Sequence, residues 1–183
     1  MKQGKILIIN GASSSGKTSL AKEFLKISID PYVYLDLDSF NEKITTFYGS
    51  LLPSLFINQS DDISSDVYEI LGPTIMQLFS KTTSLLSHLG NNVVVDHIIG
   101  EAKIAEGLKD LTQKHPVYFV GLNCPIYELE RREVSRGNRE RGLARSHYNI
   151  IHNFLEYDLI LDTKKMSTSE CANLLLDHIN TQH

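Results

Sequence analysis

A short glycine-rich segment near the start of the chain carries the residues best suited to chemistry. It follows the apolar residues 6–9 and reads Gly11-Ala12-Ser13-Ser14-Ser15-Gly16-Lys17-Thr18. The pattern G-x-x-x-x-G-K-[ST] predicts a loop whose backbone N–H groups surround phosphate oxygens, with the lysine on the terminal phosphates and the threonine hydroxyl on Mg²⁺. We call residues 11–18 the phosphate loop and expect it, with the adjoining Ser19, to bind a nucleoside triphosphate.

Two physical features of the phosphate loop support this interpretation. Glycine permits the tight backbone turn around an anion, and the helix that follows directs its positive end toward the phosphates. The alternative is a glycine- and serine-rich turn that closes a strand–helix unit and binds nothing. The apolar run before the loop and the helical pattern after it favour the phosphate site.

Acidic and basic side chains follow three other apolar runs. Asp38 comes after residues 33–37, Asp96 and His97 follow residues 93–95, and an arginine-rich segment at 130–142 follows the run at 117–122. In parallel sheets, ligands collect at the carboxyl ends of the strands. We therefore expect these side chains to share one crevice with the phosphate loop.

Asp38 is the candidate general base. At the end of a strand, its carboxylate can face the γ-phosphate and accept the proton of an attacking hydroxyl. The alternative is that Asp38, beside Ser39, caps the following helix. Spacing alone leaves both interpretations open. Asp36 shares the strand face of Asp38 and is the weaker candidate, for a place near the metal.

Asp96 and His97 end a strand together and are candidate substrate contacts. A carboxylate at this position is typical of a group that holds Mg²⁺ or its water, so Thr18 and Asp96 are the candidate metal ligands. A local cap or hydrogen bond is the alternative for Asp96. His97 can contact the substrate or act as an acid, although a single histidine beside a strand end is more often structural.

The segment 130–142 carries five arginines and two glycines. The glycines predict a short lid at about residues 136–142 that closes over the triphosphate. Arg136 and Arg139 flank the first glycine, and the planar guanidinium suits bidentate phosphate contacts, so we expect both to stabilise the migrating charge.

Arg132 shows the alternative reading of the same segment. It lies four residues after Glu128, a spacing that forms an ion pair on one solvated helix face. Some arginines of the segment are expected to do only this. Arg132 is also a candidate for contact with the nucleotide, because the planar guanidinium suits bidentate phosphate contacts.

These side chains require a scaffold of alternating strands and helices. Short apolar runs predict strands at residues 5–10, 33–37, 92–96, 117–122 and 158–161. Longer patterns predict helices at residues 17–28, 40–48, 66–89, 101–114, 126–136, 143–156 and 169–181. Ser39 with Glu42, and Ser167 with Glu170, match capping boxes. The polar residues 58–65 are expected to be a connection. The whole predicts a wound α/β fold with a parallel five-stranded sheet and helices on both faces.

Length and composition narrow the function further. A chain of 183 residues suits one domain, at 1–183, with a single sizeable core. The net charge of −4 disfavours a nucleic-acid binder or a basic membrane-surface protein, so a small-molecule partner is expected. No apolar run is long enough to cross a bilayer, and residues 1–5 do not resemble a signal peptide, which favours the cytoplasm. Cys124 and Cys171 are expected in the core.

The chain resembles the chloramphenicol phosphotransferase-like proteins, small P-loop kinases related in fold to adenylate and shikimate kinases. The resemblance includes the phosphate loop, Leu37-Asp38-Ser39 and residues 93–97, and it is densest at residues 120–125, 129–133, 135–139 and 142–145. It implies a nucleotide-kinase-like P-loop NTPase fold, ATP and Mg²⁺ as cofactors, and Asp38 as the base. Asn138 stands where the family's lid has an acid, and residues 48–78 do not match the family's substrate-recognising region.

The sequence thus predicts an ATP-dependent kinase that phosphorylates a hydroxyl of a small molecule. The alternatives are a nucleotide or nucleoside kinase, and an ATP-binding regulatory protein without an acceptor. Residues 40–80 contain no arginine to hold the phosphate of a nucleotide acceptor. The apolar side chains of residues 40–56 are expected to line a neutral pocket near Asp38 and His97. The sequence does not identify the acceptor or the oligomeric state.

Overall fold

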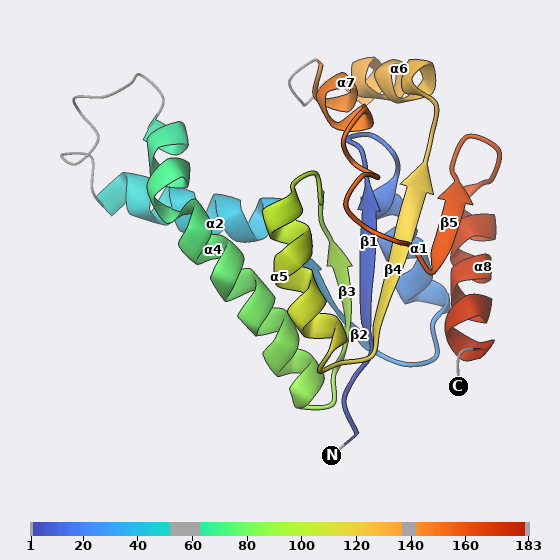
Figure 1. Ribbon diagram of the computed structural model, residues 1–183. Coiled ribbons are helices and arrows are strands. Elements are labelled where there is room, and N and C mark those ends of the chain that lie inside the picture. The colour runs from blue at the N-terminus through green and yellow to red at the C-terminus, as the bar shows by residue number, and fades with distance from the viewer. Residues whose placement is uncertain (1, 52–62, 137–141, 182–183) are drawn as a thin grey trace.

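A parallel β-sheet forms the centre of the protein (Figure 1). The computed structural model describes residues 2–51, 63–136 and 142–181. The sheet has five strands in the order β2-β3-β1-β4-β5, with every neighbouring pair parallel. The strands are β1 (Ile6–Gly11), β2 (Tyr32–Asp36), β3 (Asn92–Asp96), β4 (Val117–Asn123) and β5 (Leu159–Asp162). The predicted wound α/β fold is confirmed.

Helices cover both faces of the sheet (Figure 1). They are α1 (Lys17–Ile27), α2 (Leu37–Leu51), α4 (Ile63–His88), α5 (Ala102–Thr112), α6 (Ile126–Arg136), α7 (Leu143–Tyr148) and α8 (Thr168–Thr181). α1 and α8 pack on one face, and α2, α4 and α5 lie on the other. α6 and α7 lie beyond the carboxyl end of β4 (Figure 1).

Alternation along β1 explains why its sequence is apolar without interruption. Leu7 and Ile9 belong to the core beneath α1 and α8, whereas Ile6 and Ile8 belong to the core beneath α4 and α5. All four side chains are fully buried, as expected of a central parallel strand covered by helices on both faces. Cys124 and Cys171 are also buried, as predicted.

The start of α2 differs from the prediction. The helix begins at Leu37 instead of residue 40, because the Ser39 backbone N–H donates to Asp36 Oδ1 at 2.8 Å. Asp36 therefore caps the helix, and the predicted capping box of Ser39 with Glu42 is wrong. The second predicted box is confirmed, since Ser167 N–H donates to Glu170 Oε2 at 2.8 Å.

The helix predicted at 143–156 is shorter than its sequence pattern indicates. α7 ends at Tyr148, and turns follow it. The Ile151 carbonyl accepts hydrogen bonds from Asn10 Nδ2 at 2.9 Å and from the Tyr157 hydroxyl at 3.2 Å. The bond from Asn10 ties the segment to the end of β1, and the bond from Tyr157 closes the segment on itself, so irregular chain replaces a longer helix.

The helix predicted at residues 66–89 starts three residues earlier than expected. α4 begins at Ile63 and contains Pro73. The connection predicted at 58–65 lies outside the described residues up to 62, and residues 63–65 belong to α4. Within the part of the chain that the structure describes, no helix combines the length and apolar character needed to cross a membrane.

Candidate active site

The phosphate loop joins β1 to α1 and has the backbone that its sequence requires. Gly16 has φ of 101° and Ser14 has φ of 63°, both in the left-handed region. A Cβ at Gly11 would lie 2.6 Å from Ser15 Oγ and 3.0 Å from Leu122 Cβ. One glycine is thus required for its backbone angles and the other for close packing.

Three serine hydroxyls of the loop lack partners within the protein. The Oγ atoms of Ser13, Ser14 and Ser15 are buried and make no hydrogen bond. Buried polar atoms without partners are costly, and native structures rarely keep them without a ligand or water. A row of such donors at the start of a helix fits a bound phosphate group.

Lys17 lies where it can reach that phosphate. Its side chain is buried, and its Nζ donates to the carbonyl oxygens of Gly11 at 2.9 Å and Ala12 at 3.2 Å. The ammonium therefore lies against the phosphate loop, beside the expected phosphate position. This placement agrees with the prediction that loop and lysine form one phosphate cradle.

Thr18 and Asp96 meet across the carboxyl ends of β1 and β3. The Thr18 hydroxyl donates to Asp96 Oδ2 at 2.6 Å. A hydroxyl and a carboxylate oxygen suit Mg²⁺, which binds few protein ligands and keeps several waters. The described residues hold no cluster of three or more His, Cys, Asp or Glu side chains that could hold a metal alone. The predicted pair therefore fits Mg²⁺ shared with a nucleotide.

Tyr34 is a member of this site that the sequence analysis missed. Its hydroxyl donates to the same Asp96 Oδ2 at 3.1 Å. Burial, followed by the charges of Asp96 and Asp36, raises the pKa of Tyr34, so the phenol stays protonated as a donor. Strand alternation was the available signal, because Tyr34 shares a face of β2 with Asp36.

Asp38 lies in the first turn of α2 and is exposed to the cleft. An open cleft of about 1130 Å³ runs along the carboxyl ends of the strands, and Asp38 lines it together with Lys17 and Asp96. Because Asp36 is the residue that caps α2, the alternative role of Asp38 as the helix cap is wrong. Its carboxylate is close enough to oppose the lowering of the His97 pKa.

His97 is buried beneath the cleft in a neutral state. Burial, with a smaller contribution from Lys17, lowers its pKa to about 4. Only 6% of the residue is exposed, and its Nε2 is buried without a hydrogen-bond partner. Its ring packs edge-on against Phe79 at a centroid distance of 6.1 Å. A purely structural histidine would normally have satisfied both ring nitrogens.

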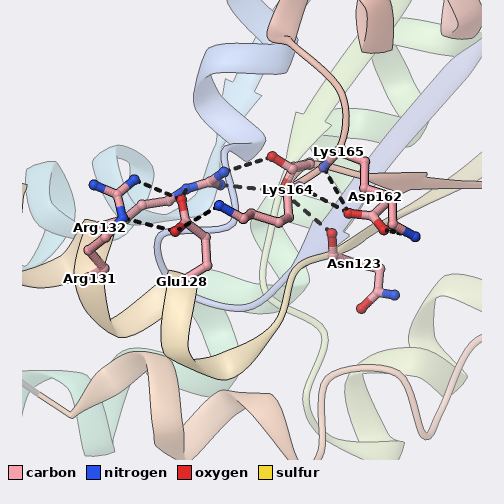
Figure 2. A network of polar contacts seen from close by, with 8 residues as sticks. Asn123, Glu128, Arg131, Arg132, Asp162, Lys164 and Lys165 are labelled. Carbon is pink, nitrogen blue, oxygen red and sulfur yellow. Dashed lines mark hydrogen bonds and ion pairs between the residues drawn. The ribbon is translucent and has the colours of Figure 1, made fainter.

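A network of charges fixes Arg132 at the opposite wall of the cleft (Figure 2). Arg132 Nε donates to Glu128 Oε1 at 2.9 Å, and its Nη2 donates to the Thr163 carbonyl at 2.7 Å. Glu128 also binds Arg131 and, at 3.6 Å, Lys164. The predicted pair of Glu128 with Arg132 is confirmed. Contact of Arg132 with a nucleotide stays a prediction. The guanidinium has further N–H donors that could make this contact.

The same network holds the Glu128 carboxylate ionised. Hydrogen bonds from Arg131 and then from Arg132 lower the pKa of Glu128 to about 2, against the effect of burial. A buried carboxylate thus orients a guanidinium that joins α6 to the segment after β5 (Figure 2). The arrangement makes this wall of the cleft rigid and positively charged.

Glu133 anchors the far end of the predicted lid. Its buried carboxylate accepts the backbone N–H groups of Gly142 at 2.8 Å and Ala144 at 2.8 Å. Arg136 ends α6 and lines the cleft. Arg139 and the rest of the lid at 137–141 lie outside the described residues.

The structure brings most of the predicted residues into one cleft. Its lining includes the predicted Ser14, Ser15, Gly16, Lys17, Thr18, Ser19, Asp38, Asp96, His97, Arg132 and Arg136. The prediction that Phe40 lines a pocket at the cleft is wrong. Its ring packs against the core residue Phe79, with 5.4 Å between the ring centroids, and does not line this cleft. The side chains of residues 47–56 lie outside the description.

Comparison with known proteins agrees with this geometry. A family model described as "Chloramphenicol phosphotransferase-like protein" matches residues 4–180. A Mycobacterium tuberculosis protein named "Putative O-phosphotransferase" is 27% identical over 191 residues, which cover 96% of this chain and 82% of that protein.

Solved structures share the fold at lower identity. The Mycobacterium tuberculosis APS kinase CysC has a TM-score of 0.64 at 20% identity, covering 98% of this chain and 99% of that chain. A gluconokinase from Sinorhizobium meliloti has a TM-score of 0.65 at 17% identity, covering 99% of this chain and 94% of that chain. With the phosphate loop on such a kinase fold and the family match spanning nearly the whole sequence, the chain belongs to the chloramphenicol phosphotransferase-like family and is a kinase-type phosphotransferase.

Proposed function

We propose that this protein transfers the γ-phosphate of ATP to a hydroxyl group of a small molecule. The observation that carries the proposal is the meeting, in one cleft, of an unsatisfied phosphate cradle with a carboxylate exposed on the facing helix. The nucleotide supplies the phosphoryl group, and Asp38 is the group that accepts a proton from the acceptor. The APS kinase structure, solved with AMPPNP and APS, supports a nucleotide in the corresponding fold.

The residues divide the work of binding and positioning. Lys17, the serine hydroxyls and the backbone N–H groups of the phosphate loop hold the phosphate oxygens. Thr18 and Asp96 hold Mg²⁺, which when bound neutralises charge on the phosphates. Tyr34 donates to Asp96 and keeps its carboxylate oriented. These contacts position the reactants, which is most of what phosphoryl transfer requires of a protein.

Asp38 acts on the acceptor side. Its carboxylate accepts the proton of the attacking hydroxyl as the new O–P bond forms and the bond between the γ-phosphorus and the bridging oxygen of ADP breaks. Arg136, and Arg139 in the lid at about 136–142, stabilise the charge that develops on the transferred group. In this scheme the whole chain, residues 1–183, is one catalytic unit.

Charge at the acceptor side favours an uncharged acceptor. Asp36, Asp38 and Glu42 all line the cleft where α2 begins. The arginines that line the same cleft, Arg132 and Arg136, belong to α6. A phosphate group on the acceptor would meet carboxylates at α2, and like charges there oppose binding. A neutral hydroxyl compound therefore fits better than a nucleoside monophosphate.

An acceptor screen tests the proposal. Purified protein with ATP and Mg²⁺ is incubated with hydroxylated compounds, and ADP release is measured above the rate without acceptor. We expect at least one neutral alcohol to stimulate release and to gain one phosphate by mass spectrometry. Lys43→Gln, which also removes one charge from an exposed residue of α2 but lies outside the cleft lining, serves as the matched control for Asp38→Asn. Stimulation by nucleoside monophosphates alone would contradict a neutral acceptor, and no stimulation by any compound would contradict the kinase reaction.

A further inference from the structure

Asn10 carries the polar side chain of β1 and lies directly before the phosphate loop. The side chain is fully buried, and no step of the proposed reaction uses it. Burial of an amide is costly unless its donors and its acceptor are paired. The partners of Asn10 therefore indicate what the residue holds in place.

Each end of the Asn10 amide bonds a different part of the chain. Its Oδ1 accepts the backbone N–H of Ile99, after β3, at 2.9 Å. Its Nδ2 donates to the Ile151 carbonyl at 2.9 Å and to the Tyr157 hydroxyl at 2.7 Å, both between α7 and β5. A backbone N–H only donates and a carbonyl only accepts, so these partners fix the orientation of the amide.

The Tyr157 side holds the amide in one arrangement. The Tyr157 hydroxyl donates in turn to the Ile151 carbonyl at 3.2 Å, which closes a ring of three polar groups. The Tyr157 ring lies against β4, where a Cβ at Gly121 would come within 2.9 Å of the ring carbon Cγ. A buried network whose members are all paired is rigid. Asn10 thus presents its oxygen to Ile99 from a fixed position.

The Ile99 side leads to the acceptor side of the active-site cleft. His97 and Ile98, directly before Ile99, both line the cleft. β3 ends at Asp96, and the His97 N–H still reaches a carbonyl of β1 at 3.3 Å. The bond from the Ile99 N–H to Asn10 continues this attachment to β1 through a side chain. The amide therefore holds the segment 97–99 beside the phosphate loop.

We propose that Asn10 is a positioning residue that sets the place of His97 and Ile98 on the acceptor side of the cleft. It acts through the Ile99 N–H and lies outside the cleft lining itself. This inference rests on the proposed function, because His97 faces an acceptor only if a hydroxyl compound is phosphorylated. Without the amide, the segment 97–99 loses its attachment to the end of β1, and a shift of about 1 Å beside a reacting group costs about 10²-fold in turnover.

Three variants isolate the role of the amide. Asn10→Leu keeps the size of the side chain and removes both of its polar ends. Asn92→Leu is the matched control, because Asn92 accepts the Lys5 N–H at 2.9 Å and donates to the Pro31 carbonyl at 3.3 Å where β3 begins, at the other end of the sheet. Tyr157→Phe is the milder variant, since it keeps the ring and removes only the hydroxyl that orients the amide.

Amide hydrogen exchange, followed by NMR, measures the attachment of the segment 97–99 without requiring turnover. We expect the Ile99 amide to exchange about tenfold faster in Asn10→Leu than in the wild type, because its acceptor is lost. In Asn92→Leu the Ile99 amide should be unchanged, and the Lys5 amide should exchange faster instead. Equal exchange of the Ile99 amide in Asn10→Leu and the wild type overturns the proposal.

Kinetics with the alcohol that gives the highest rate in the acceptor screen separate this inference from the proposed function. The kcat/KM for that alcohol should fall by about tenfold in Asn10→Leu and by about fivefold in Tyr157→Phe, while the affinity for AMPPNP stays the same. Asn92→Leu should retain both quantities. If Asn10→Leu does not fold, Tyr157→Phe decides by the same two measurements.

Two other results overturn the positioning role while the kinase reaction stands. One is a loss of thermal stability in Asn10→Leu or Tyr157→Phe with an unchanged kcat/KM, which makes the amide a support of the fold only. The other is an AMPPNP affinity that falls as much as kcat/KM, which makes the amide a support of the phosphate loop. If the wild type phosphorylates no alcohol, the proposed function fails, and the positioning role fails with it whatever the exchange rates.

Discussion

The two halves of the active-site cleft are built in different ways. The nucleotide half is nearly continuous in sequence, since the phosphate loop and the start of α1 supply its hydroxyls and its lysine. The acceptor half combines Asp38 from α2 with His97 after β3, two residues that are far apart in the sequence. The shape of the phosphate loop is set by residues that are neighbours in the sequence, whereas the shape of the acceptor half depends on how distant elements pack. Changes in the first half should affect nucleotide binding, and changes in the second should affect transfer alone.

Substitution of Asp38 is expected to separate the halves most sharply. Asp38→Asn keeps the shape but removes the basic oxygen, so turnover should fall by about 10³-fold. Titration with a fluorescent ATP analogue should show an unchanged affinity, because the residue acts on the acceptor. A weakened nucleotide affinity would instead place Asp38 in the other half.

Lys17→Ala tests the nucleotide half. Loss of a buried ammonium at the phosphates should weaken both ATP binding and turnover by a factor on the order of 10². Isothermal titration with ATP and a coupled ADP assay measure the two effects. Lys26→Ala, at the exposed end of the same helix in a surface pair with Glu23, is the control and should retain both. An ATP affinity in Lys17→Ala equal to that of the wild type would contradict the proposed role of the phosphate loop in nucleotide binding.

Arg136→Lys tests whether the arginine wall belongs to the transition state. An ammonium keeps the charge but not the planar fork, so kcat should fall by about tenfold while ATP affinity changes less. Arg139→Lys is expected to behave alike. Steady-state kinetics with titrated ATP give both quantities. Near-normal kcat in both variants would leave these arginines as surface charges.

Tyr34→Phe probes the contact through which β2 reaches Asp96. Removing the hydroxyl that donates to Asp96 Oδ2 should reduce kcat and raise the Mg²⁺ concentration needed for half-maximal rate by about tenfold. Rate measurements across Mg²⁺ concentrations provide the test. An unchanged Mg²⁺ requirement with reduced thermal stability would show that the contact only supports the fold.

His115 provides a perturbation outside both halves. Ser87 Oγ donates to the Gly4 carbonyl, so it accepts from His115 Nδ1, and Ser84 Oγ donates to Nε2 at 2.8 Å. Burial, then the charges of His88 and Lys114, lowers the pKa of His115. The unfolded chain therefore binds this proton more readily, and stability should fall as pH drops below about 6.5.

Urea unfolding at pH 7.5 and pH 5.5 measures this dependence. The loss of unfolding free energy at the lower pH should be smaller in His115→Gln than in the wild type, while ATP affinity at pH 7.5 stays the same. An equal loss in both proteins would show that other groups carry the acid sensitivity, and a changed ATP affinity would connect this cluster to the nucleotide half.

Local rules allowed much of the molecule to be predicted from its sequence. The motif at residues 11–18 specifies a turn, a helix start and a lysine, all through neighbouring residues. The apolar runs at 6–9 and 93–95 indicate buried parallel strands, and Asp96 follows from the end of its strand. The box of Ser167 with Glu170 is likewise a contact within one turn. In each case the determining residues are close in sequence.

Tertiary structure decided the rest, because the deciding contacts join residues far apart in the chain. Asn10 holds the Ile151 carbonyl and so ends α7 early, although the sequence pattern continues. Tyr34 joins Asp96 only because β2 and β3 pair in register. Asn10 also meets the Ile99 N–H, because the segment after β3 passes beside the end of β1. Local propensity fixes elements and motifs, whereas the packing of these elements determines which side chains meet and which polar atoms are left for a ligand.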